Sequence, residues 1–350
     1  MNKKWFVLIG VVVSVITMLV GCAQPAPSPA PTPTPAPEKI TLKFSTWMPA
    51  AKAHPNYVQA ERMFAEITKR TNGQVQFQMF ASEQLATQKD QIDGLKAGLF
   101  DICTHQAPTA PGKTPLWTID WQPWAPTKDV YTMMQTMRRL SKHPAMMKEL
   151  DNWGAMYLVN CITGPRTIMS KKELIKLDDF KGLKIRSSGR EAAAYQIFGA
   201  NPVSVATADM YDALSKGTID ATTLPYVNLV SYGINEVTKY FWDINVGMGS
   251  PIFIMSKNTY SKLPGDVQKI IMTVVEEDEK IHSKVNTDLT NEAMDKDKKA
   301  GKQIFNSCSP AEQKRYDDVV GDQIMGDWIK EMTDKGMPGR EIFNAFSKIP

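Results

Sequence analysis

Hydrophobic and polar residues alternate with two different periods along most of the chain. Segments 40–47 and 74–80 alternate every second residue, which predicts strands, and 99–105 also reads as a strand. Between them, residues 55–72 and 87–98 carry apolar side chains at helical spacing, and a glycine lies near the end of each segment. Strands that alternate with helices are typical of βαβ units, so we expect a largely parallel sheet covered by helices.

The second half of the chain repeats this rhythm. Strands are predicted at 155–162 and 181–187, and helices at 189–198 and 206–217. Further on, residues 250–257 read as an apolar strand. Two amphipathic stretches complete the pattern: 263–301 predicts one long helix and 309–336 one or two more.

One nine-residue pattern, D-[GA]-L-x-x-G-x-[FI]-D, occurs once in each half, at 93–101 and at 212–220. In both copies the glycine suits the left-handed position that follows a helix. The match is compatible with a generic helix–strand connection and with two lobes of similar build. Two facing α/β lobes are a common geometry for hinge closure around a ligand.

The N-terminus has the features of a secretory signal. A short positive start precedes sixteen apolar residues, which is short for a membrane-spanning helix. Leu19-Val20-Gly21-Cys22 resembles the lipobox of bacterial lipoproteins, in which Cys22 is acylated; an uncleaved membrane anchor is the alternative. We therefore expect a signal peptide at 1–21 and a lipidated cysteine with a Pro-rich, extended spacer at 22–38. Either reading places the body of the protein outside the cytoplasm.

Composition and motifs narrow the class further. The chain has 350 residues and a formal net charge of only +4, so it lacks the strongly basic field of a nucleic-acid-binding protein. Cys103 and Cys161 lie in apolar contexts, which favours buried free thiols over a disulfide. The scattered histidines form no metal motif, and the nucleophile-elbow, Walker, dinucleotide and zinc-protease motifs are absent. We expect neither enzymatic activity nor a cofactor.

A series of motifs, in the same order along the chain, resembles the extracytoplasmic solute-binding subunits of TRAP transporters, the DctP-type family. The most specific blocks, spread over the second half, are LDDFKGLKIRSSG (177–189), GANPVSVATADMYDALSKGTIDA (199–221) and INEVTKYF (234–241). Weaker similarities are LKFSTWMPAAKAHP, FASEQLATQKDQIDGLKAGLFDI and APGKTPLW (110–117). The resemblance covers roughly residues 39–345. The family's D-G is Asp220-Ala221 here, and Leu224 lies near where many members have an asparagine, so the ligand is the part left open.

The resemblance implies an α/β, two-lobe periplasmic-binding-protein-like fold of type II-like build, with hinge strands and a long connecting helix. Lobe I is expected to comprise 39–163 plus about 252–291, and lobe II 164–251 plus about 292–350. Such a protein captures a small organic acid and delivers it to an ion-gradient-driven membrane permease. A ligand-sensing module that presents the acid to a signalling partner is the alternative. The implied partners are a small carboxylate, the permease subunits and the membrane, through a lipid on Cys22.

Arg186 is the first candidate for contact with an anion. It follows the buried pattern of Leu183 and Ile185 at the carboxyl end of a predicted strand, where open α/β sheets bind ligands. Ser188-x-x-Glu191 reads as a capping box that begins a helix, whose N-terminal N–H groups favour an anion. An arginine also contacts a carboxylate bidentately. A structural salt bridge is the alternative, and the resemblance implies the carboxylate.

Several polar residues join Arg186 as ligand-binding candidates. Arg166 could engage the same carboxylate or a second polar group, or form a salt bridge at the hinge. Gln106 follows a strand in the mirrored position of lobe I and, being neutral, tolerates an anionic or hydroxylated ligand; a place on the surface or behind the ligand contacts is the alternative. Asp209 and Tyr211 begin the short helix at 206–217, where the first could simply cap it and the second simply pack.

Aromatic residues near strand ends complete the candidate site. Trp47 ends the first strand, and His54 lies in the loop that follows. Trp117 belongs to a Pro-rich connection that also contains Trp121 and Trp124; each tryptophan is either a core residue or part of an apolar pocket wall. Two or more in the pocket would indicate a ligand with an aromatic or bulky apolar group. The weaker candidates are Tyr226 and Asn228.

Overall fold

The computed structural model describes residues 38–50 and 54–349. The predicted signal peptide, Cys22 and nearly all of the predicted spacer lie outside these residues. From Glu38 onward the chain forms one compact unit. Within the described ranges, we find no helix that combines the length and the apolar character needed to cross a membrane.

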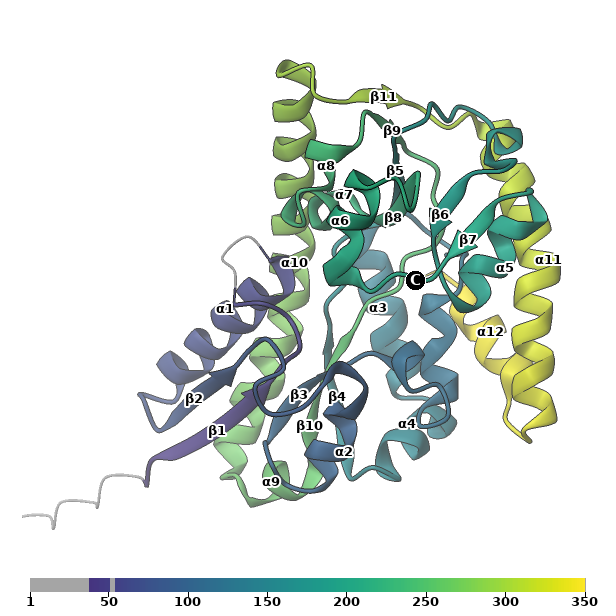
Figure 1. Ribbon diagram of the computed structural model, residues 1–350. Helices are drawn as coiled ribbons and strands as arrows, with labels where there is room; N and C mark the ends of the chain where they lie inside the picture. The colour runs from purple at the N-terminus through teal and green to yellow at the C-terminus, as the bar shows by residue number, and fades with distance from the viewer. Residues whose placement is uncertain (1–37, 51–53, 350) are drawn as a thin grey trace, which may run out of the picture. The chain divides into compact units, whose positions relative to one another are not determined.

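Two mixed β-sheets organise this unit, one in each lobe (Figure 1). The sheet of lobe I has the order β2 (Val75–Phe80), β1 (Ile40–Ser45), β3 (Ile102–His105), β10 (Ile252–Ser256) and β4 (Ala155–Asn160). The sheet of lobe II has the order β11 (Ile304–Asn306), β9 (Tyr240–Trp242), β5 (Arg166–Ser170), β8 (Ala221–Pro225), β6 (Lys184–Arg186) and β7 (Asn201–Val203). The expected α/β class with two lobes is confirmed.

The expectation of a largely parallel sheet is only partly correct. Strands β2, β1 and β3 are parallel to one another, as are β7, β6 and β8. Strand β10 instead runs antiparallel to β3 and β4, and β5 runs antiparallel to β8 and β9. The reason is the chain path: β4 leads directly into β5 of the other sheet, and β10 returns from lobe II. Short antiparallel strands therefore join βαβ units that are themselves parallel.

Twelve α-helices are present in the described part of the chain. They are α1 (Pro55–Arg70), α2 (Gln91–Lys96), α3 (Val130–Ser141), α4 (Pro144–Asp151), α5 (Gly189–Ile197), α6 (Met210–Ser215), α7 (Tyr226–Ser231), α8 (Ile234–Val237), α9 (Lys257–Lys262), α10 (Gly265–Lys299), α11 (Pro310–Asp334) and α12 (Gly339–Ser347). The pattern correctly predicted α1, α2, α5, α6, α10 and α11. It did not identify α3 and α4, although their buried residues, such as Met133, Met137 and Leu140, recur at helical spacing.

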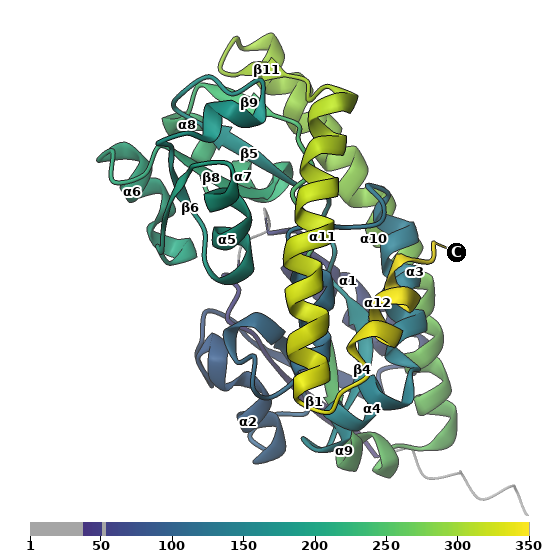
Figure 2. The same ribbon diagram turned by 90° about the vertical axis from the view of Figure 1, so that its right-hand side faces the viewer.

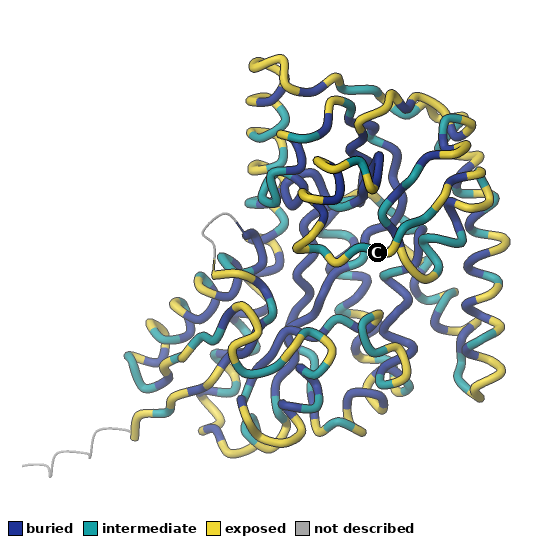
Figure 3. Tube along the Cα trace, viewed as in Figure 1, coloured by how far each residue is buried: buried dark blue, intermediate teal, exposed yellow. Residues whose placement is uncertain are grey.

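Buried side chains form separate cores on the two sheets, and strands β3, β5 and β10 are buried along nearly all of their length (Figure 3). In β5, Ile168 packs into one lobe II core and Met169 into the core on the opposite face, as the alternation of a strand requires. The C-terminal helix corrects one expectation. Ile342 and Phe346 of α12 belong to the lobe I core, although the segment from 292 to the C-terminus was assigned to lobe II.

Two long helices contact both lobes (Figure 2). Helix α10 packs against α1, α3 and β4 of lobe I and against α7 of lobe II. In α11, Tyr316 and Val320 pack into the lobe II core, whereas Trp328 and Met332 pack into the lobe I core. The indole N–H of Trp328 also donates to Thr118 Oγ1 at 2.9 Å. The lobes are thus joined by these helices as well as by the strand crossings.

The repeated nine-residue pattern has the same structure in both lobes. Asp101 follows α2 and accepts a hydrogen bond from the backbone N–H of Lys43 in β1 at 2.8 Å. Asp220 follows α6 and accepts one from the backbone N–H of Lys184 in β6 at 3.0 Å. Each aspartate also donates its backbone N–H to the carbonyl of the same lysine. The repeat therefore fixes equivalent parallel strand pairs in the two lobes.

Candidate functional site

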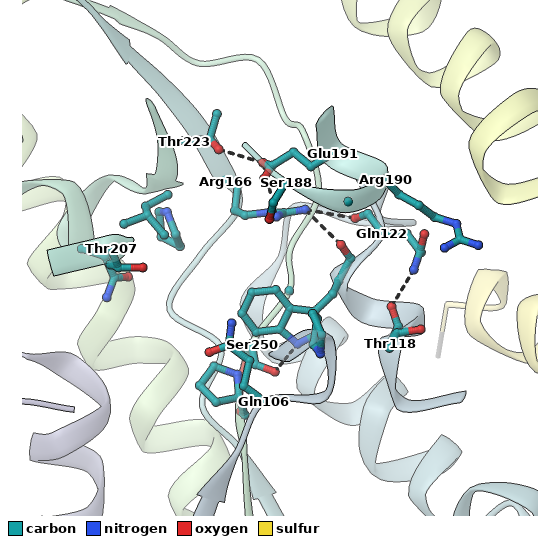
Figure 4. Close-up of a pocket in the computed structure, with 18 of the residues that line it drawn as sticks. Gln106, Thr118, Gln122, Arg166, Ser188, Arg190, Glu191, Thr207, Thr223 and Ser250 are labelled. Atoms are coloured by element: carbon teal, nitrogen blue, oxygen red, sulfur yellow. Dashed lines mark hydrogen bonds and ion pairs between the residues drawn. The ribbon is translucent and has the colours of Figure 1, made fainter. Parts of the chain in front are cut away.

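A cavity of about 580 Å³ lies between the two sheets and is lined from both lobes. Lobe I supplies residues that follow β1 and β3, together with part of the 3₁₀ segment Pro115–Trp121. Lobe II supplies the ends of β5, β6 and β8 and the start of α5 (Figure 4). Its size and concave shape suit a small organic molecule.

Arg186 lies in the cavity wall at the carboxyl end of β6, as predicted. Its Nε donates to the carbonyl of Val205 at 3.1 Å, and its Nη2 donates to Thr207 Oγ1 at 3.0 Å. These neutral acceptors hold the guanidinium in place. Within residues 38–50 and 54–349, it forms no ion pair with an acidic side chain, so its charge remains available to an anion.

Arg166 also lines the cavity, but two of its three guanidinium nitrogens already contact protein oxygens, while the buried Nε has no hydrogen-bond partner among the described residues. Its Nη2 lies 3.1 Å from the carbonyl oxygen of Gln122 and 3.2 Å from that of Val246, and its Nη1 lies 3.4 Å from Glu191 Oε1. The alternative that the sequence left open, an ion pair near the crossing strands, is therefore present. A direct contact between Arg166 and a ligand stays a prediction.

The predicted capping box at Ser188 is wrong. Helix α5 does begin at Gly189, but the Ser188 side chain makes no capping hydrogen bond. The Glu191 carboxylate turns instead toward Arg166 and accepts a hydrogen bond from Thr223 Oγ1 at 2.7 Å (Figure 4). It accepts a second hydrogen bond from Tyr195 Oη at 2.9 Å. A charged partner from β5 outcompetes the local backbone N–H for this carboxylate.

Lobe I contributes neutral candidates to the opposite wall. Trp47, His54 and Gln106 all line the cavity. The side-chain oxygen Oε1 of Gln106 accepts a hydrogen bond from Gln88 Nε2 at 2.5 Å, which leaves the Gln106 side-chain NH₂ available as a donor. Burial lowers the pKa of His54 to about 4, so its imidazole is neutral at pH 7. Its ring meets that of Tyr232 from lobe II edge to face, 6.3 Å between centroids.

Two of the tryptophans considered from the sequence line the cavity, and one named candidate does not. Trp121 is in the wall with Trp47, and its indole N–H donates to the carbonyl of Ser250 at 2.9 Å. Trp117 is a correction: it is only 2% exposed and packs in the lobe I core. Its indole N–H donates to the carbonyl of Met146, and its ring stacks on Tyr157. The Pro-rich segment turns Trp121 toward the cavity and Trp117 toward the core.

Three other candidates lie away from the cavity, and one lies in its wall. Tyr226 is buried in a lobe II core, where its hydroxyl donates to Asp297 at 2.8 Å. Asp209 is exposed, and Tyr211 is exposed over 38% of its surface. Both point away because the short helix α6 packs its opposite face on the lobe. Asn228, by contrast, lines the cavity and accepts a hydrogen bond from Thr163 at 2.5 Å.

Several lining residues were not among the sequence candidates. Thr223 precedes the end of β8, Thr207 begins a 3₁₀ turn, and Tyr232 follows α7. Thr223 could have been found from its place in a strand that enters the cleft. Arg190 and Glu331 form an ion pair in the wall, and Glu331 also pairs with Lys335. Glu331 comes from α11, about 140 positions after Arg190, so no local pattern links them.

No cluster of three or more histidine, cysteine or acidic side chains is present among the residues that the structure describes. Cys161 lines the cavity as a free thiol, and burial raises its pKa well above the usual value, so it is not an activated thiolate. The buried free thiols predicted at Cys103 and Cys161 are confirmed.

Comparisons with known proteins agree with this geometry. Residues 47–323 match the family DctP, described as bacterial extracellular solute-binding protein, family 7. The C4-dicarboxylate-binding periplasmic protein DctP of Rhodobacter capsulatus is 25% identical over 288 residues, which cover 81% of this chain and 85% of that protein.

Solved structures share the fold at low sequence identity. A TRAP periplasmic solute-binding protein from Desulfovibrio salexigens has a TM-score of 0.78 at 24% identity, covering 88% of this chain and 94% of that one. A TRAP solute-binding protein from Rhodoferax ferrireducens, in complex with copurified benzoate, has a TM-score of 0.76 at 23% identity, covering 88% and 97%. With its two sheets, interlobe cavity and family match over residues 47–323, the chain belongs to the DctP family of bacterial extracellular solute-binding proteins.

Proposed function

We propose that the protein is a TRAP-type receptor that captures a small carboxylate outside the cytoplasm and delivers it to an ion-gradient-driven permease. The observation that carries the proposal is Arg186. It lies at a strand end in an interlobe cavity, oriented by Val205 and Thr207, and no described acidic residue neutralises it. A carboxylate that enters the cavity supplies the missing partner, and the start of α5 adds backbone N–H groups nearby.

Part of the lining supports a ligand with an apolar body. Trp47, Trp121 and Met332 line the cavity. Five prolines line it as well: Pro108, Pro111, Pro115, Pro225 and Pro251. Such rigid, apolar walls favour a ring or a bulky apolar group beside the carboxylate. Among the structural relatives, the Rhodoferax ferrireducens protein was found with benzoate.

We also propose that a lipid on Cys22 tethers the receptor to the membrane. The lipobox-like Leu19-Val20-Gly21-Cys22 and the Pro-rich segment that follows support this assignment. The full-length protein expressed in a bacterium should fractionate with membranes, and Cys22→Ser should release it into the soluble extracytoplasmic fraction. Equal membrane retention of the two forms would contradict lipidation at Cys22.

Thermal-shift screening with small acids tests the proposed function. A ligand that binds the folded state raises the melting temperature by mass action, so the correct acids should stabilise the protein in a concentration-dependent way. The screen should include aromatic acids, 2-oxo acids, sugar acids and dicarboxylates. Arg186→Ala should remove the stabilisation while the melting temperature without ligand stays close to that of the wild type. Recovery of the ligand unchanged after long incubation separates a receptor from an enzyme.

A further inference from the structure

Glu191 is fixed in the wall of the cavity beside the buried guanidinium of Arg166. Its side chain is only 11% exposed, and Oε1 lies 3.4 Å from Arg166 Nη1. The same oxygen accepts hydrogen bonds from Thr223 in β8 and from Tyr195 in α5. Burial raises the pKa of Tyr195 well above its usual value, so this phenol remains a donor to the carboxylate.

Arg166 cannot easily leave this pair for a ligand. Its side chain is 6% exposed, and its Nη2 contacts the carbonyl oxygens of Gln122 and Val246. Gly247 packs directly against it, since a Cβ at that position would lie 2.6 Å from Nη2. The pair of Arg166 and Glu191 is therefore preformed, and its two charges cancel within the cavity wall.

The remaining charges of the lining leave one cation uncompensated. Arg190 is paired with Glu331. His54 is neutral at pH 7 because burial lowers its pKa to about 4. Asp120 lies behind the wall near Arg166, and burial raises its pKa well above the usual value, which favours its neutral form. Of the charged residues that the structure describes in the lining, Arg186 alone has no opposite charge beside it.

We propose that Glu191 makes this site selective for monoanionic carboxylates over dicarboxylates. The inference rests on the proposed function, since it assumes that Arg186 binds the first carboxylate. A second carboxylate in the same cavity would meet the Glu191 carboxylate instead of a free arginine. Because Glu191 already neutralises Arg166, the second carboxylate would lose water without gaining a cationic partner. A desolvated charge without a partner is an effective way to exclude a related ligand. Glu191 is thus a specificity-determining residue that need not touch the preferred ligand.

Calorimetric titration of matched acids tests this selectivity. Benzoate is compared with isophthalate and butyrate with succinate. The strongest ligand of the thermal-shift screen is compared with its analogue that has one carboxylate more or fewer. In each matched pair of acids of which one binds, the wild-type protein should bind the monoanion at least about tenfold more tightly than the dianion. Equal or tighter binding of the dicarboxylates by the wild type would overturn the proposal without any variant.

A charge-neutral, isosteric substitution then isolates the role of Glu191. Glu191→Gln removes the charge that neutralises Arg166. The ratio of the dissociation constant of the dianion to that of the monoanion should therefore fall by about tenfold or more. Tyr195→Phe is the matched control, because it removes one hydrogen bond to the same carboxylate, keeps the aromatic stacking on Phe180 and leaves the charges unchanged. It should leave the ratio within about threefold of the wild-type value. An unchanged ratio in a folded Glu191→Gln protein also contradicts the proposal.

Failure of this inference is distinguishable from failure of the proposed function. If dicarboxylates bind best and Arg186→Ala still abolishes their binding, the receptor function stands and the role of Glu191 is wrong. If neither these acids nor any acid of the screen binds, the proposed function itself fails, and the inference fails with it.

Discussion

The two lobes share a local architecture but present different chemistry to the cavity between them. In each, an aspartate after a helix binds the backbone of a lysine in the adjacent parallel strand: Asp101 with Lys43 in lobe I, and Asp220 with Lys184 in lobe II. Two positions beyond the lysine, lobe I has Ser45 and lobe II has Arg186. Arg186 lines the cavity, whereas Ser45 is fully buried and is not among the lining residues, so the repeated backbone frame carries different chemistry in the two lobes.

The difference extends over the whole lining. Lobe I contributes Trp47, His54 and Gln106, which are uncharged at pH 7. Lobe II contributes all three arginines of the lining and the glutamate beside Arg166. Glu331 is the exception, on the half of α11 that packs against lobe I. This division suggests that lobe II recognises the anionic end of a ligand, while lobe I shapes the space for the rest of it.

The largest expected effect is on ligand affinity, and it is measured by replacing one candidate ligand contact in each lobe: Arg186 in lobe II and Gln106 in lobe I. Arg186→Ala should weaken carboxylate binding by about 100-fold or more, because loss of a partly buried ionic contact removes several kcal/mol. Gln106→Ala should weaken it by about tenfold or less, as expected for a neutral hydrogen bond. Calorimetry with the best ligand of the screen measures both. An equal loss in the two variants would break the assignment of the charged end to lobe II.

Acid should destabilise lobe I through its buried histidines. Residues 164–251 of lobe II contain no histidine, whereas burial, followed by the charge of Lys113, lowers the pKa of His105 to about 4. Between pH 6.5 and 4 the unfolded chain therefore binds more protons at His105 than the folded chain does. The stability linked to neutral His105 is present above pH 6.5 and is lost as the pH falls toward 4.

Urea denaturation at pH 7 and pH 5 measures this effect. His105 should account for about 2 kcal/mol of the loss in unfolding free energy between these pH values. His105→Gln should lose correspondingly less stability over that interval, and His143→Gln, at a half-buried position, is the control. The same loss in the wild type and in His105→Gln would argue against a role for this histidine.

The repeated aspartates should contribute similarly to the two lobes. Asp101→Ala and Asp220→Ala each remove a carboxylate that binds a backbone N–H of the neighbouring strand. Each should lower the unfolding free energy by about 1.5–2 kcal/mol, the lower part of the range for a hydrogen bond to a charged group. Denaturant titrations of both variants measure the two losses. A loss confined to one variant would mean that the repeat is structural in only one lobe.

The smallest effects on stability are expected from substitutions at the N-cap residues of two helices, α3 and α5. Asp129 Oδ1 accepts a hydrogen bond from the backbone N–H of Thr132 at 2.7 Å, so Asp129→Ala should cost about 1 kcal/mol. Ser188 makes no such bond at α5, and Ser188→Ala should change stability by less than about 0.5 kcal/mol. Thermal unfolding compares them. A larger loss at Ser188 would restore the capping function that the sequence pattern suggested.

Much of the fold could be predicted because its signals are local. Period-two and helical spacing identified β1 to β3 with their helices, and the glycine in each repeat marked a helix end: Gly98 and Gly217 both have positive φ. The antiparallel strands, and their positions in the two sheets, were harder to predict. All five residues of β5 are buried, so it shows no alternation, and β10 depends on a chain crossing that no local pattern encodes.

The residues of the candidate site were predictable where the path of the backbone alone decides whether a side chain reaches the cavity. Arg186, Gln106 and Trp47 lie at or just after strand ends, and all reach the cavity. Trp117 and Tyr226 do not, because core packing decides which way a side chain in a connection or at a helix start turns. Glu191 was misread for the same reason. Its local pattern predicts a cap, but its partner Arg166 lies 25 positions earlier, on another strand.

The position of the bound carboxylate is the most direct test of the account. A crystal structure of the protein with a monocarboxylate ligand should show the carboxylate on the Arg186 guanidinium. Glu191 should remain beside Arg166, with Oε1 close to Nη1 as in the present structure. A carboxylate bound to Arg166 with Glu191 displaced, or one that contacts lobe I alone, would contradict the claim that lobe II presents a single free positive charge.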